Sequence, residues 1–280
     1  MTRVAINGIH LNVEVAGRGP AIAALHGFTG SLATWDAFAK EASEDYTLVR
    51  LDLHGHGSSD APVDSTRYRM EHCLADLETL LDRLGHQRVH WLGYSMGGRI
   101  ALSAAIALPH RTLSLVAESA SPGLATAEER AERIKSDEAL AEWAETVGAQ
   151  RFVDYWEALP LFATQQRLPL AVREKIRAQR EKTTTIGLAN SLRGIGTGAQ
   201  PALYDKLSRL KAPALLLAGE EDTKFVEIAH QMHGAISNSE VMIIPGVGHA
   251  AHLEKPGQFN SAVLGFLART QVAIATSRAP

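Results

Sequence analysis

The sequence predicts an α/β protein built around one mostly parallel sheet. Short apolar segments recur along the chain, stretches with apolar residues at helical spacing separate most of them, and the first two segments flank an Asn7-Gly8 pair. An Asn-Gly turn joins antiparallel strands, whereas strands that alternate with helices run parallel. The chain has 280 residues, 45% of them hydrophobic, which is enough for one large core.

The predicted elements follow one another in a regular order. Eight segments have the apolar composition of strands: residues 4–6, 11–15, 21–25, 47–51, 89–92, 113–117, 214–218 and 240–244. Helices are predicted between or after them, at residues 35–42, 69–84, 99–108 and 259–268. We expect the tail after Thr270 to be loose.

The stretch between the sixth and seventh predicted strands breaks the alternation. It contains two charged helical stretches, 128–147 and 172–181, and no strand rich in Val or Ile. We therefore expect a helical cap at residues 122–200, inserted into a core made of residues 1–121 and 201–280. Such caps lie over the carboxyl ends of the strands, where ligands bind. The glycine run near the end of the cap lacks the Lys-Ser/Thr of a phosphate loop, and we expect a flexible hinge there.

The most specific motif is Gly93-Tyr94-Ser95-Met96-Gly97, between the fifth strand and the helix that follows. A G-x-S-x-G sequence in this context indicates the nucleophile elbow of an α/β-hydrolase fold. Only small residues fit at the flanking positions, and the serine projects toward the N-terminus of the helix. The alternative is a glycine-rich turn with an idle serine.

A serine nucleophile needs a basic histidine and a carboxylate that orients it. In this fold the acid follows a late strand and the histidine follows the last one. Asp222 has the usual spacing after the seventh strand, with Glu220, Glu221 and Glu118 as rivals. His249 lies in the glycine-containing loop after the eighth strand and is the predicted base.

An oxyanion hole needs two backbone N–H groups. Met96, which follows the serine, is predicted to supply one, and Phe28, in the loop after the third strand, the other. The 52–58 loop is expected to be a structural turn that shapes the pocket floor. His249 and His252 have H-x-x-H spacing, but no third ligand pattern accompanies them, so we expect neither a metal nor a cofactor.

Charge and composition exclude several classes of partner. The net charge is -3, with no basic or acidic block, which argues against nucleic acid or a membrane surface. No apolar run approaches the roughly 20 residues needed to cross a bilayer, and residues 1–8 do not look like a signal peptide. The only cysteine, Cys73, allows no intrachain disulfide and is expected in a helix core. We expect a cytoplasmic monomer or small homo-oligomer that acts on a small molecule.

Arginines near the predicted site indicate a substrate with several carboxylates, because guanidinium binds carboxylate bidentately. Arg99 lies one turn into the elbow helix, and Arg133 lies in the cap. We expect both at the site, with solvated helix faces as the alternative. For Arg130 and Arg193 we favour that alternative.

The elbow with Arg99, together with four further segments, resembles the MenH family, the 2-succinyl-6-hydroxy-2,4-cyclohexadiene-1-carboxylate synthases of menaquinone biosynthesis. The similar segments are residues 26–30, 93–99, 133–137, 192–201 and 219–225, and the resemblance covers residues 4–268. It implies a lyase that eliminates pyruvate from 2-succinyl-5-enolpyruvyl-6-hydroxy-3-cyclohexene-1-carboxylate. It also implies that the serine, with its histidine and aspartate, abstracts a ring proton while the two amides stabilise an enolate-like oxygen.

By the same resemblance, Arg99 and Arg133 bind the substrate's carboxylates, and Tyr94 and Trp156 line the pocket. Ordinary packing is the alternative for the two aromatic residues. The competing function is a serine hydrolase of small esters or C–C bonds with the same triad. A receptor without turnover is a third, against which the intact Ser95, Asp222 and His249 argue.

Overall fold

The structure, a computed structural model, describes residues 2–276 and contains one eight-stranded sheet. The strand order is β1-β2-β4-β3-β5-β6-β7-β8, in which β1 pairs antiparallel with β2, β2 antiparallel with β4, and every other pair is parallel. The strands are β1 (Thr2–Ile6), β2 (Ile9–Gly17), β3 (Ala21–Leu25), β4 (Thr47–Leu51), β5 (Val89–Tyr94), β6 (Thr112–Glu118), β7 (Ala214–Gly219) and β8 (Ser239–Ile244). The predicted sheet with its N-terminal hairpin is confirmed.

Helices cover both faces of this sheet. One face carries α2 (Met70–Leu84), α3 (Met96–Ala107) and α7 (Thr223–Ala235), and the other carries α1 (Asp36–Ala42), α8 (Ala251–Glu254) and α9 (Pro256–Thr276). Short 3₁₀ helices connect the larger elements at η1 (Leu32–Trp35), η2 (Ser65–Tyr68), η3 (Pro109–Arg111) and η5 (Tyr204–Arg209). Each face of the sheet carries one hydrophobic core, and a third, smaller cluster lies among the inserted helices.

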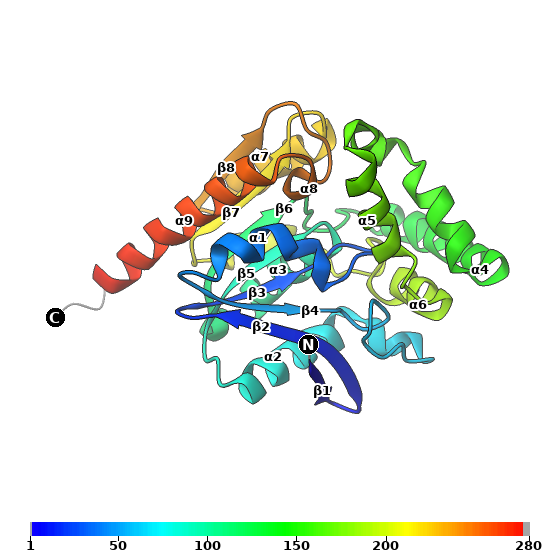
Figure 1. The fold of residues 1–280 in the computed structure, drawn as a ribbon, viewed down its shortest axis with the longest axis horizontal. Helices are drawn as coiled ribbons and strands as arrows, with labels where there is room; N and C mark the ends of the chain where they lie inside the picture. The colour runs from blue at the N-terminus through cyan, green and yellow to red at the C-terminus, as the bar shows by residue number, and fades with distance from the viewer. Residues whose placement is uncertain (1, 277–280) are drawn as a thin grey trace.

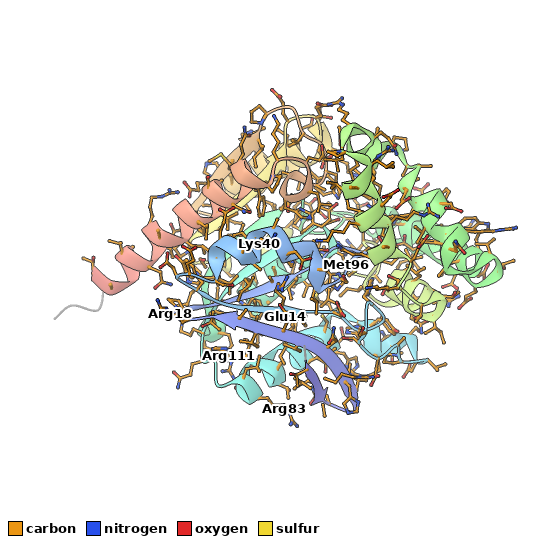
Figure 2. The ribbon with its side chains drawn as sticks, viewed as in Figure 1. Glu14, Arg18, Lys40, Arg83, Met96 and Arg111 are labelled. Atoms are coloured by element: carbon orange, nitrogen blue, oxygen red, sulfur yellow. The ribbon has the colours of Figure 1, made fainter. Side chains whose placement is uncertain are left out.

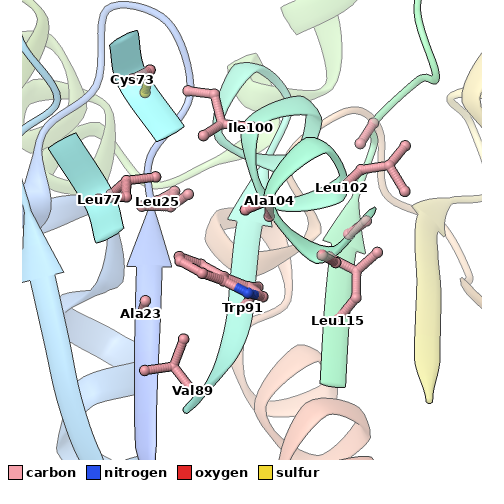
Figure 3. Close-up of a cluster of buried hydrophobic side chains, with 14 of the residues drawn as sticks. Ala23, Leu25, Cys73, Leu77, Val89, Trp91, Ile100, Leu102, Ala104 and Leu115 are labelled. Carbon is pink, nitrogen blue, oxygen red and sulfur yellow. The ribbon is translucent and has the colours of Figure 1, made fainter. Parts of the chain in front are cut away.

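The larger core holds the elbow strand and helix in place. Figure 3 shows Trp91 of β5 beneath α3, with Ala23 of β3 on one side and Leu115 of β6 on the other. Trp91 is fully buried, and its indole Nε1 donates to Thr112 Oγ1 over 3.1 Å. Cys73 of α2 is buried in the same core, as predicted. Burial of an aromatic side chain of this size anchors the strand that leads into the elbow.

The segment between β6 and β7 is helical throughout its regular structure. It contains α4 (Ala127–Glu157, kinked at Gly148), η4 (Pro160–Arg167), α5 (Leu170–Arg180) and α6 (Thr185–Ile195). These helices gather beyond the end of the sheet toward which β4 points (Figure 1). Met96 lies inside the molecule on the side facing them, whereas Arg83 points outward from α2 (Figure 2). The cap bounds at residues 122 and 200 remain a prediction.

Two sequence-based expectations are wrong. The tail after Thr270 is not loose up to residue 276, because α9 continues to Thr276 through residues without glycine or proline. Gly194 and Gly196, where a flexible hinge was predicted, are closely packed instead. A Cβ at Gly194 would lie 2.5 Å from Tyr68 Cβ, and one at Gly196 would lie 2.3 Å from the Leu192 carbonyl oxygen. Helices α6 and α7 had no counterpart among the predicted elements.

Candidate active site

The elbow forces Ser95 into a conformation that only tight packing sustains. Its φ is 51° and its ψ is -110°, in a region that costs an ordinary residue free energy. A Cβ at Gly93 would lie 2.2 Å from the Gly97 carbonyl oxygen, and a Cβ at Gly97 would lie 2.2 Å from the Leu25 carbonyl oxygen. The glycines of the motif are therefore required by the close approach of β3, β5 and α3.

The predicted acid, base and nucleophile lie within hydrogen-bonding distance of one another. His249 Nδ1 is 2.7 Å from Asp222 Oδ2, and His249 Nε2 is 3.0 Å from Ser95 Oγ. Asp222 follows β7 and His249 follows β8, so adjacent strands deliver both groups to one edge of the sheet. Because Nδ1–H donates to the carboxylate, Nε2 is left to accept the serine proton. The imidazole is buried and its tautomer is set for base chemistry.

Of the rival acids, none contacts His249. Glu221 forms an ion pair with Arg167, and Glu220 accepts from the Gly246 N–H. Glu118 lies against His252 instead. Among these four carboxylates, only Asp222 is placed to orient the base.

The two predicted oxyanion donors border the same cavity as Ser95. Met96 begins α3, so its N–H has no partner within the helix. Phe28 lies in the turn closed by the hydrogen bond from Gly30 N to Gly27 O, 3.0 Å long. Within residues 2–276, neither of the two N–H groups donates to a backbone oxygen in the turns and loops.

The 52–58 loop is structural, but it supports the Phe28 loop rather than the pocket floor. None of its residues lines the cavity. Asp52 Oδ1 accepts from Leu32 N over 2.6 Å, and His26 Nε2 accepts from Leu53 N over 3.0 Å. These bonds hold the turn that carries Phe28 from behind.

A cavity of about 380 Å³ lies between the strand ends and the inserted helices. Its lining includes Ser95 and His249 from the sheet side, and Trp156 and Phe162 from the inserted side. The apolar side chains in such a lining exclude water, and interactions between charges in the cavity become stronger as a result. The volume suits a small molecule rather than a polymer.

Arg99 and Arg133 both reach this cavity. Arg99 Nη1 donates to Ile195 O over 2.9 Å and to Gln200 Oε1 over 2.5 Å. Arg133 Nε donates to Asp137 Oδ1 over 2.7 Å. Burial, with the positive Arg133 nearby, lowers the pKa of Arg99 to about 10, so Arg99 remains charged at neutral pH. The other nitrogens of both guanidinium groups remain available for an anion.

Arg130 and Arg193 do not line the cavity, in agreement with the prediction for them. Arg130 donates to the Leu124 and Ala125 carbonyl oxygens, and Arg193 forms ion pairs with Glu138 and Glu145.

Tyr94, at the end of β5, and Trp156, in the inserted helix α4, both line the cavity. The Trp156 ring lies 5.0 Å from Phe28 and stacks on Phe152 at 5.8 Å between centroids. Tyr94 is buried, and burial followed by the nearby Glu118 carboxylate raises its pKa well above the usual value. Tyr94 therefore stays a neutral phenol beside the nucleophile.

Sequence reasoning missed two cationic residues of the cavity, Arg180 and Lys224. Arg180 is buried, with its guanidinium carbon 5.1 Å above the Phe162 ring and its Nη1 donating to Glu157 Oε1 over 3.1 Å. It ends α5, a helix whose charged sequence gives no sign of which arginine points inward. Lys224 lies in the 219–225 segment, and its position two residues after Asp222 was the available signal.

Within the described part of the chain, no group of three or more His, Cys, Asp or Glu side chains is placed to hold a metal ion. His249 and His252 are directed to different carboxylates, Asp222 and Glu118. Among residues 2–276, no helix has both the length and the apolar character to cross a membrane.

Comparison with known proteins gives a consistent family. The sequence pattern of the alpha/beta hydrolase fold matches residues 20–256. A Bacillus subtilis protein, provisionally named 2-succinyl-6-hydroxy-2,4-cyclohexadiene-1-carboxylate synthase, is 44% identical over 90% of this chain and 93% of its own. The synthase of that name from Serratia proteamaculans is 30% identical over 87% of this chain and 91% of its own. The structure of MenH from S. aureus superimposes with a TM-score of 0.89 at 35% identity, covering 94% of this chain and 99% of that one.

Proposed function

We propose that this chain, which belongs to the α/β-hydrolase fold and within it to the 2-succinyl-6-hydroxy-2,4-cyclohexadiene-1-carboxylate synthases, performs its elimination through Ser95, His249 and Asp222. The enzyme is a lyase of menaquinone biosynthesis that uses a hydrolase scaffold. It releases pyruvate from 2-succinyl-5-enolpyruvyl-6-hydroxy-3-cyclohexene-1-carboxylate. The residue roles below are our proposal.

Proton abstraction is the first step. Ser95 Oγ passes its proton to His249 Nε2, 3.0 Å away, and takes the proton from the ring carbon that bears the succinyl group. Asp222, 2.7 Å from Nδ1, stabilises the imidazolium that forms. The electron pair of the broken C–H bond moves into the succinyl carbonyl. When the carbonyl re-forms, a C2=C3 double bond forms in the ring, the C3=C4 double bond shifts to C4=C5, and the bond from C5 to the enolpyruvyl oxygen breaks. Enolpyruvate takes up a proton and becomes pyruvate, so no covalent bond to Ser95 is needed.

The negative charge that develops on the succinyl carbonyl oxygen needs donors that do not move. The N–H groups of Phe28 and Met96 border the cavity next to Ser95, without other backbone partners in the described loops. Removing one donor of this kind typically costs about 3 kcal/mol of barrier stabilisation. The same arrangement that binds a tetrahedral oxyanion in a hydrolase thus serves an enolate here.

The substrate carries three carboxylates, and the cavity offers guanidinium groups to bind them. Arg99, Arg133 and Arg180 line it, and each is already oriented by a protein partner. Charge-assisted hydrogen bonds from arginine are roughly twice as strong as neutral ones, and the geometry is specific for carboxylate. Trp156 and Tyr94 form apolar walls between these charges.

The observation that carries this assignment is one cavity containing both a complete serine–histidine–aspartate arrangement and three arginines. A hydrolase of neutral esters requires the first feature and has no use for the second. The hydrolase alternative therefore makes a different prediction for charged and neutral substrates.

The direct test is to incubate the purified protein with 2-succinyl-5-enolpyruvyl-6-hydroxy-3-cyclohexene-1-carboxylate and follow pyruvate with lactate dehydrogenase. Ser95→Ala protein is the control for spontaneous decay of the substrate. Release that depends on Ser95 supports the proposed roles. Release at the control rate, together with rapid hydrolysis of a small ester, would favour the hydrolase instead. The cytoplasmic location and the monomer or small homo-oligomer remain predictions.

A further inference from the structure

Behind the elbow, Glu118 and His252 form a second buried histidine–carboxylate pair. The proposed mechanism does not use this pair. We propose that Glu118 is a positioning residue. From behind the site, it holds two segments in a fixed position relative to each other: the turn that carries Ser95 and the loop that carries His249. The proposal rests on Ser95 and His249 being the reacting pair.

Glu118 contacts both the turn of Ser95 and the segment that follows His249. Its carbonyl oxygen accepts from Ser95 N over 2.9 Å. Its carboxylate Oε1 accepts from the backbone N–H of His252 over 3.1 Å, and Oε2 lies 2.7 Å from His252 Nδ1. His252 follows His249 by three residues, in the short helix α8. One residue at the end of β6 thus connects the serine to the segment that follows the histidine.

The His252 ring extends this contact to the cavity wall. Its centroid is 4.5 Å from that of Tyr94, and the Tyr94 ring is 5.4 Å from His249. Tyr94 in turn fills the space left by Gly27, where a Cβ would lie 2.7 Å from the Tyr94 ring. The Glu118–His252 pair therefore supports the nucleophile, the base and the loop of the oxyanion donor Phe28 together.

The polar atoms of the His252 ring are closed off from the cavity. His252 borders the cavity, but within the described residues both ring nitrogens are inaccessible and lack an aligned hydrogen bond. Oε2 of Glu118 lies 2.7 Å from Nδ1 without meeting the criteria of a hydrogen bond. Glu118 and His252 can act only through the residues that they hold.

Burying the Glu118 carboxylate costs folding free energy unless the group makes compensating interactions. Glu118 is 0% exposed, and burying such a group is unfavourable unless it is paired. An apolar side chain would fill the same volume without this cost, but it could not accept the His252 N–H. The hydrogen bond from the His252 N–H and the contact with Nδ1 offset part of this cost, and both tie the carboxylate to the loop that follows His249.

The test compares two buried carboxylates, Glu118 and Asp76. Asp76 is 2% exposed, accepts from Asn7 and Arg67, and does not line the cavity. The variants are Glu118→Gln, which keeps an acceptor for the His252 N–H, and Asp76→Asn. For each, we would measure the rate at which a fluorophosphonate labels Ser95, kcat and KM for pyruvate release, and the low-field NMR signal of the His249 Nδ1 proton. In the labelling step, Ser95 Oγ bonds to phosphorus, fluoride leaves and the serine proton passes to His249.

We expect Glu118→Gln to slow both labelling and kcat by about 10–100-fold, because small misplacements of reacting groups have effects of that size. KM should change little and the Nδ1 proton signal should shift. Asp76→Asn should lower stability and leave all three measurements as in the parent. If Glu118→Gln does not fold, His252→Gln should give the same result from the other partner.

Folded Glu118→Gln protein that labels at the parent rate would overturn the proposal. So would equal slowing in Asp76→Asn, because it would mean that lost stability alone explains the effect. Labelling needs no natural substrate, so a parent protein that labels but releases no pyruvate would refute the proposed function and leave the role of Glu118 measurable.

Discussion

The elbow and the arginine-lined wall of the same cavity are held by different forces. Around Ser95, backbone atoms meet so closely that a Cβ at Gly93 or Gly97 would lie 2.2 Å from a carbonyl oxygen. The guanidinium groups of Arg99, Arg133 and Arg180 instead end flexible side chains, each directed by hydrogen bonds to neighbouring groups. The proposed nucleophile is therefore fixed by the main chain, whereas the positions of the three guanidinium groups depend on the hydrogen bonds that their side chains make. Changes in the first region should reduce kcat or folding, and changes in the second should raise KM.

The largest effect is expected from Gly97→Ala. The added methyl group would meet the Leu25 carbonyl oxygen, and overpacking of this kind costs about 3 kcal/mol of unfolding free energy. The kcat of any folded protein should fall as well, since the elbow must open. Urea denaturation and the pyruvate assay measure both effects.

Gly234→Ala is the matched control for that variant. Gly234 lies in α7 with nothing within 4 Å of its would-be Cβ, so alanine should be neutral or stabilising there. Equal stability losses in the two variants would break the distinction between the elbow and ordinary helix.

The second-largest effect is expected in the arginine-lined wall of the cavity. Arg133→Ala should raise KM for the tricarboxylate by about 10–100-fold, because a hydrogen bond to a charged group contributes about 1.5–3 kcal/mol. The kcat/KM for a neutral ester should change little. Steady-state kinetics on both substrates measure the effect.

Arg130→Ala supplies the comparison for Arg133→Ala, because Arg130 lies on the same helix and donates only to the Leu124 and Ala125 carbonyl oxygens. It should leave both substrates unaffected. Equal losses on charged and neutral substrates in Arg133→Ala would mean that Arg133 only supports α4.

The third prediction concerns the loss of stability at low pH, which arises in the buried core behind both regions. Burial lowers the pKa of His54, after β4, and of His90, in β5, to about 4 each. The unfolded chain takes up these protons near pH 6.5 and the folded chain only near 4, so the free energy of unfolding falls as pH drops through this window. The loss is about 3 kcal/mol for each histidine at most. Denaturation curves from pH 4 to 7 should show it.

His90→Gln should make that curve shallower, since one of the depressed histidine titrations is removed and those of His26, His54, His56 and His86 remain. An unchanged slope would assign the acid sensitivity to other groups.

The smallest effect is expected at the exposed contact between the inserted helix α5 and helix α1 of the sheet layer. Lys175 of α5 donates to Asp36 of α1 over 2.8 Å, but the Lys175 side chain is 61% exposed. Lys175→Ala should change the unfolding free energy by less than about 1 kcal/mol, because solvent screens exposed pairs. It should leave kcat as it was. A larger loss in thermal denaturation would show that this contact holds the inserted helices on the sheet.

The sequence predicted the elbow and the sheet because both depend on local rules. Glycine spacing around Ser95 and short apolar segments separated by helical ones leave few alternatives. Asp222 and His249 followed from the order of the fold. Arg180 and helix α6 were missed because the sequence of a charged or glycine-containing helix does not indicate which part of the protein it will pack against. Gly194 and Gly196 resembled a hinge for the same reason, since the Tyr68 and Leu192 atoms against which they pack are not evident from spacing.

The central claim is that Ser95 acts as a base and forms no covalent bond with the substrate. The most direct measurement uses substrate deuterated at the ring carbon that bears the succinyl group, with intact-protein mass spectrometry during turnover. The account predicts slower pyruvate release from the deuterated substrate and no mass added to the enzyme. A substrate-derived adduct on Ser95, with release that is indifferent to deuterium, would contradict it.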